Sequence, residues 1–223
     1  QRVKTNLLDK YTALVDTQKA IGALPEGQDT NLAVTLYPGR TRARLDEFHE
    51  EIGQPLLDAV AASGFSWDEI GRYLHARHAA EANRILQQRN PGRVNNTELS
   101  GMSNEEAAQV IAFHAGDETL ELIGQYVDQI SEKRVQLMVD SGLLTPTEGK
   151  AWRTSYRHYI PLNREEAGGL VPKRGKGFDV RGRESKLRAG STKPVDHKHI
   201  LAHLLGQYEA TIARSEKNRV AQA

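Results

Sequence analysis

The chain of 223 residues contains no cysteine. This absence excludes disulfide bonds, thiolate catalysis and zinc sites built from cysteine. Long apolar runs are also missing, since none approaches the ~18 residues of a membrane-spanning helix. No secretory signal is visible at the start of the sequence. We therefore expect a protein without a membrane span that is not secreted by a signal peptide.

A strong net charge is absent as well. The chain carries 30 Lys and Arg against 29 Asp and Glu, a formal charge of +1, so there is no global attraction to nucleic acid. The distribution is uneven, because residues 172–193 carry a local charge of +6 and the rest of the chain sums to −5. The basic residues of this stretch are Lys173, Arg174, Lys176, Arg181, Arg183, Lys186, Arg188 and Lys193.

Strand signals are scarce, and helical periodicity dominates instead. The best extended candidate, 157–162, contains Pro161, which favours an edge strand or an irregular connector. Apolar residues at helical spacing predict helices at about 3–22, 38–60, 66–89, 103–115, 117–141 and 146–157, and from about 196 to the end. The predicted fold class is all-α: an irregular multi-helix bundle with a long basic loop and little or no strand.

Several residues mark where these helices begin, bend and end. Pro38 is expected to open the second helix, while Gly53 and Pro55 are expected to kink or split it. Gly142 is expected to end the helix at 117–141. Three helix starts match the capping box, in which a hydroxyl and a glutamate each satisfy a free backbone amide; they are Ser66 with Glu69, Ser103 with Glu106, and Thr145 with Glu148.

The domain organisation follows from this pattern. We expect a helical bundle at 1–162, a basic loop or linker at 163–194, and a C-terminal helix at 195–223 that packs back on the bundle. The first residue is Gln1 rather than Met, and no stop signal ends the last helix, so we expect a piece of a longer parent chain.

The basic loop has two interpretations. Flexible Lys and Arg side chains can neutralise phosphates and bind nucleic acid without regard to sequence. On this interpretation the nucleic-acid-binding residues are Lys173, Arg174, Lys176, Arg181, Arg183, Lys186 and Arg188. The alternative is a solvated connector, and the sequence alone favours neither. Just upstream, an expected hydrophobic anchor docks the base of the loop; its residues are Tyr156, His158 and Tyr159, together with Trp152.

The stretch YLHARHAAEANRIL, residues 73–86, contains two histidines three residues apart. On a helix, His78 falls in the apolar stripe and His75 lies to one flank. A shared metal would need a third protein ligand, which Glu81 could supply only with distortion. We therefore expect His78 to be packed and hydrogen-bonded in the core.

The last helix contains a spacing better suited to a metal. His199 and His203 are four residues apart and would face the same way on a helix. The zinc-protease motif is absent, because Ile200 stands where its glutamate would be. We expect an exposed or interhelical histidine pair, with a divalent metal site as the alternative. No cofactor is expected.

Four phrases occur in order along the chain: YLHARHAAEANRIL, SGMSNEEAAQVI, WRTSYRHYIPLNR and HILAHLLGQYEATIARSEKNRVAQA. Together they resemble a helical region of very large multidomain proteins of tailed phages and conjugative elements, called polyvalent proteins. The resemblance spans roughly residues 1–223. It implies delivery into the host with DNA, with the protein inside the virion and then in the host cytoplasm. No catalytic residue is carried over from it.

These observations lead to one functional hypothesis and two alternatives. The first is a non-catalytic accessory or scaffolding domain of a phage or mobile-element protein, which contacts other domains of its parent chain and the DNA backbone. The second is a metal-dependent enzyme using His199 and His203, or a helical cap on a neighbouring catalytic domain. The third is a structural spacer or oligomerisation module.

Overall fold

The fold is that of a computed structural model, which describes residues 16, 17, 20, 22, 28–90, 92, 98–163 and 194–223. Within these residues the chain is helical and contains no strand, as the predicted all-α class requires. The elements are α2 (Thr30–Phe48), the π-helical turn η2 (His49–Gly53), α3 (Gln54–Ser63), α4 (Trp67–Arg89), α5 (Asn104–Phe113), α6 (Glu118–Asp140), α7 (Pro146–Ser155), the 3-10 turn η4 (His197–His199) and α8 (Ile200–Gln222). The helix expected at about 3–22 lies outside the described residues apart from isolated positions.

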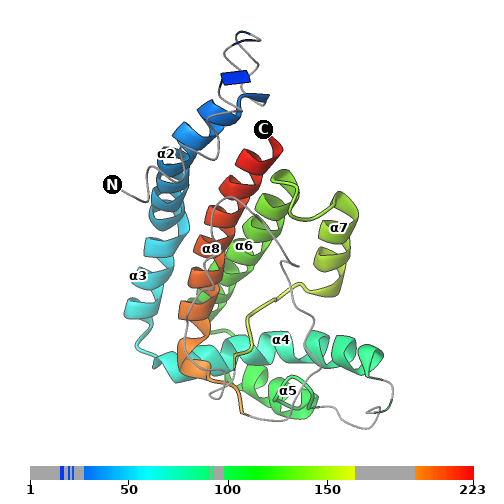
Figure 1. Cartoon of the computed structure of the whole chain (residues 1–223). Helices are drawn as coiled ribbons and strands as arrows, with labels where there is room; N and C mark the ends of the chain where they lie inside the picture. The colour runs from blue at the N-terminus through cyan, green and yellow to red at the C-terminus, as the bar shows by residue number, and fades with distance from the viewer. Residues whose placement is uncertain are drawn as a thin grey trace.

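The helices form an upright bundle on a transverse base (Figure 1). The continuous column of α2, η2 and α3 runs antiparallel to α6 and α8, and α8 packs against both α2 and α6. Helix α4 crosses beneath this column with α5 packed along it, and α7 flanks α6. None of the described helices combines the length and apolar character needed to cross a membrane.

The main core lies where the column meets α4. Leu56, Ile70, Leu120 and Ile200 are completely buried there, although they come from four different helices. Burying apolar side chains of this size is the main favourable term in folding. The irregular segment 157–162 also contributes, because Ile160 and Leu162 are buried in the same cluster. This segment is a connector rather than a strand, as Pro161 indicated.

Local signals explain most of the helix boundaries. Ser66 and Thr145 form complete capping boxes with the glutamates that follow them. Ser103 accepts the N–H of Glu106, but the Glu106 carboxylate pairs with Arg72 of α4 at 2.9 Å instead of returning to the cap. The predicted box at Ser103 is therefore only half formed, because the Glu106 carboxylate takes part in an interhelical ion pair instead.

Gly142 ends α6 as predicted. Its φ of +71° is in the left-handed region, and its N–H donates to the carbonyl of Val139 at 3.0 Å. The N–H of Leu143 reaches back to the carbonyl of Met138 at 2.8 Å. These two bonds make up a Schellman motif, which satisfies carbonyls that the helix itself leaves free.

The prediction for Pro38 is wrong, whereas the prediction for Gly53 and Pro55 is confirmed. Pro38 lies inside α2, which begins earlier because the Asp29 carboxylate accepts the N–H of Leu32 at 2.7 Å. The cap at Asp29 therefore decides where the helix starts. Further along, the helix widens into the π-turn η2 and resumes at Gln54, with Pro55 in the first turn of α3.

Candidate functional site

The basic residues predicted to bind nucleic acid lie outside the described residues, but both ends of their segment are described. Lys173, Arg174, Lys176, Arg181, Arg183, Lys186 and Arg188 all fall within 164–193. On either side of it, Leu162 and Val195 are buried in the main core. The N–H of Asp196 donates to the carbonyl of Asn163 at 3.1 Å. The two flanks of the basic segment therefore meet at one place on the helical body.

Glu81 of α4 anchors the first flank. Its carboxylate accepts the backbone N–H groups of Arg157 and His158, both at 2.9 Å, and contacts His78 Nδ1 at 3.0 Å. Burial alone would raise the pKa of Glu81, but these hydrogen bonds outweigh it and hold the pKa below its usual value. A charged carboxylate on α4 thus fixes the connector from which the basic segment departs.

His78 is packed and hydrogen-bonded in the core, as the sequence predicted. The residue is 3% exposed, and its ring contacts Tyr156 and Tyr159 at centroid distances of 5.6 and 5.7 Å. These two tyrosines and Trp152 pack on one another and were expected to anchor this part of the chain. The motif YLHARHAAEANRIL is therefore a structural helix that holds the connector through His78 and Glu81.

A second charged cluster holds the same connector to α6. Arg77 pairs with Asp128 at 2.6 Å, and His158 Nδ1 lies 3.0 Å from the same carboxylate. A Cβ at Gly124 would lie 2.7 Å from the Arg77 guanidinium carbon. The arginine side chain can therefore pack against α6 at this point because residue 124 has no side chain. His158 was expected in a hydrophobic anchor, but its aspartate partner places it in this ion-pair cluster instead.

The second flank is held by a histidine pair that the sequence did not predict. His75 is completely buried rather than on a flank of α4, and its Nδ1 lies 2.9 Å from His197 Nε2. The backbone of η4 packs directly on α4 at Gly71, because that residue has no side chain. A Cβ there would lie 2.7 Å from the His197 carbonyl carbon. The flank of α4 to which the sequence assigned His75 is therefore covered by a segment from far along the chain.

The predicted pair His199 and His203 does not lie on a single α-helical face. His199 belongs to η4 and α8 begins only at Ile200, and the two ring centroids are 6.3 Å apart. His199 Nδ1 contacts the Asp196 carboxylate at 2.6 Å. In the described part of the chain, no group of three or more His, Cys, Asp or Glu could hold a metal ion.

Comparisons with protein-family models, with curated proteins and with solved structures find no match for this chain. The function has to be inferred from the chain's own residues. Sequence reasoning identified His78 and the aromatic anchor, but it missed His197, Gly71 and Asp128 as parts of the anchoring sites. Glycines inside helices were a usable signal, because such a glycine often marks a close approach. Gly71 and Gly124 do so, whereas a Cβ at Gly206 would meet nothing within 4 Å.

Proposed function

We propose that this chain is a non-catalytic helical scaffolding domain that presents its basic segment, 164–193, to the DNA backbone. It would act as an accessory domain of a larger phage or mobile-element protein, as the sequence resemblance suggests. It would reside in the virion and then, after delivery, in the host cytoplasm. Its partners would be DNA, bound without sequence preference, and other domains of the parent protein.

The observation that carries this proposal is the anchoring of the two flanks. The Asn163 carbonyl and the Asp196 amide are hydrogen-bonded to each other, and the residues beside them are buried. The segment 164–193, with a charge of +5, is thereby attached at both ends to the helical body, and the rest of the chain sums to −4. Concentrated positive charge on an otherwise acidic protein favours phosphate contacts at that segment alone.

The use of the buried polar groups also supports a scaffold. His75 contacts His197, and the Glu81 carboxylate accepts the backbone N–H of Arg157. His78 in turn contacts Glu81. Asn83 likewise contacts another segment of the chain, since its amide nitrogen donates to the carbonyl of Met102 and its oxygen accepts the N–H of Ser100. Buried polar networks of this kind specify how elements are arranged.

The test is fluorescence anisotropy with a labelled DNA duplex and a labelled single strand at several salt concentrations. The first variant changes Lys173, Arg174, Lys176, Arg181 and Arg183 to Gln. A matched control removes five exposed charges from the described body instead, at Arg42, Arg89, Lys150, Arg157 and Lys198. Circular dichroism establishes that both variants keep the helical content.

We expect the native chain to bind with an affinity that falls steeply as salt rises. Each phosphate contact contributes about −0.9 to the slope of log K against log salt for duplex DNA, so removing five positive charges should flatten that slope by up to about 4.5. The control variant should keep most of the native slope. Absence of binding at low salt, or equal slopes for both variants, would refute DNA contact through this segment.

A further inference from the structure

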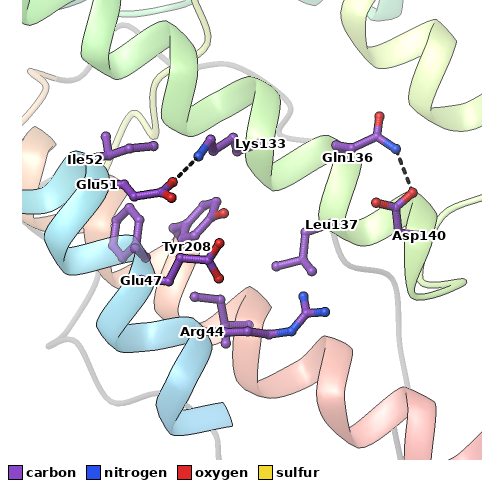
Figure 2. Close-up of a pocket in the computed structure, with 11 residues that line it drawn as sticks. Arg44, Glu47, Glu51, Ile52, Lys133, Gln136, Leu137, Asp140 and Tyr208 are labelled. Carbon is purple, nitrogen blue, oxygen red and sulfur yellow. Dashed lines mark hydrogen bonds and ion pairs between the residues drawn. The ribbon is translucent and has the colours of Figure 1, made fainter. Parts of the chain in front are cut away.

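A cleft of about 220 Å³ lies between α2 and α6 and is floored by α8 (Figure 2). It plays no part in the proposed contact with DNA. Its volume is below the ~300 Å³ at which pockets for drug-sized molecules begin, so it suits a single side chain or a small head group. The apolar part of its lining comprises Phe48, Ile52, Leu137 and Ile212.

The cations that line the cleft are already paired. Lys133 Nζ lies 2.8 Å from the Glu51 carboxylate, and this contact is drawn in Figure 2. Arg44 Nε lies 2.8 Å from Glu216, a buried carboxylate of α8. Neither positive charge is therefore free to attract an anion into the cleft.

Two carboxylates of the lining have no cationic partner among the described residues. Glu47 belongs to α2 and is exposed, and Asp140 belongs to α6 and accepts one hydrogen bond from the Gln136 amide at 2.6 Å. Figure 2 shows these two acids on the two helices that wall the cleft. The uncompensated charge of the cleft is therefore negative and comes from both walls.

A tyrosine hydroxyl between these walls also has no hydrogen-bond partner among the described residues. Tyr208 is 8% exposed, and its ring stacks on Phe48 with a centroid distance of 4.3 Å. No described residue hydrogen-bonds to its hydroxyl, which in Figure 2 points into the space between Glu47 and Leu137. Burial and the nearby negative charge of Glu47 raise the pKa of Tyr208, so the hydroxyl keeps its proton. The hydroxyl is not among the fully buried polar atoms, so it opens to the cleft and can hydrogen-bond to a ligand there.

We propose that this cleft binds the guanidinium group of an arginine side chain from a partner polypeptide. A metal ion is the poorer ligand, because the described residues include no metal-binding group of three or more. A guanidinium has five N–H donors in a planar fork, which suits acceptors that come from three helices. The apolar lining accommodates its hydrocarbon stem. An ammonium offers only three donors around one point and fits such a spread of acceptors less well.

The test is isothermal titration calorimetry with a blocked Gly-Arg-Gly peptide and with Gly-Lys-Gly for comparison. We expect the arginine peptide to bind the native chain with a dissociation constant on the order of a millimolar, as a single anchored side chain allows. Glu47→Gln and Tyr208→Phe should each weaken binding about tenfold, because each removes a partner of a charged donor. Tyr208→Phe keeps the ring stacked on Phe48, so the fold is retained.

Glu50→Gln is the matched control, since Glu50 is also an exposed acid of the same column but does not line the cleft. Its affinity should stay close to the native value. As a second readout, the bound cation should lower the pKa of Tyr208, measured as the ultraviolet ionisation of the native chain minus that of Tyr208→Phe. Equal affinity for the lysine peptide would overturn the guanidinium assignment. Failure of the native chain to bind, or equal loss in the Glu50 and Glu47 variants, would overturn the site.

Discussion

Replacement of Gly71 by alanine should destabilise the protein, although alanine is the better helix former. Gly71 lies within α4, beneath the turn that carries His197. An added Cβ would lie closest to the His197 carbonyl oxygen, 2.7 Å from its carbonyl carbon and 3.0 Å from its Cα. All three are backbone atoms, so η4 has to move away from α4, and its histidine pair with His75 is lost.

The expected magnitude follows from three opposing effects. Forcing an extra methyl into a packed contact costs about 1–3 kcal/mol. Losing the hydrogen bond between His75 and His197 costs about 0.5–1.5 kcal/mol more. Alanine returns up to about 1 kcal/mol, because glycine is unfavourable inside a helix. We therefore expect the free energy of unfolding to fall by about 0.5–3.5 kcal/mol.

Urea unfolding followed by circular dichroism measures this change, and Gly206→Ala is its control. Gly206 also lies inside a helix, α8, but a Cβ there would meet nothing within 4 Å. The control should therefore be stabilised by up to about 1 kcal/mol from helix propensity alone. If Gly71→Ala were stabilised to the same extent as Gly206→Ala, the close packing of η4 on α4 would be refuted.

Two further predictions concern pH. The pKa of Glu81 in the folded protein lies below the usual 4.5. Its contribution to stability is therefore present above about pH 4.5 and is lost as pH falls through the folded pKa. Glu81→Gln should make the free energy of unfolding depend less on pH in that acid range. Burial lowers the pKa of His197 below 6.5, so stability is present above about pH 6.5 and is lost as pH falls through the folded value. His197→Gln should remove this loss, and an unchanged pH dependence in that variant would contradict the burial of this ring.

Local sequence signals were sufficient to predict where most of the described helices begin and end. Capping residues such as Ser66 and Thr145 act within one turn, and Gly142 adopts its left-handed conformation without help from distant residues. The position of His78 was predictable for a similar reason, because helical periodicity alone assigns it to the apolar stripe. The start of α2 was not predictable from Pro38, since the capping aspartate lies nine residues earlier.

The anchoring contacts were not predictable, because their partners are far apart along the chain. His75 and His197 are separated by 122 residues, and Glu81 lies 77 residues from His158. Periodicity within α4 says which side chains share a face, but not which segment will cover that face. The same limitation applies to the cleft, whose lining comes from α2, α6 and α8.

The amino-acid sequence alone determined the helical class, most helix boundaries and the concentration of positive charge in one segment. These properties depend on residue type and on spacings of a few residues, so they do not require contacts between distant parts of the chain. The tertiary structure decided that the flanks of that segment meet, that a second histidine is buried, and that Tyr208 lies beside Glu47 in a cleft lined by three helices. Such contacts depend on how whole helices pack, because packing alone brings residues that are distant in the chain within hydrogen-bonding distance.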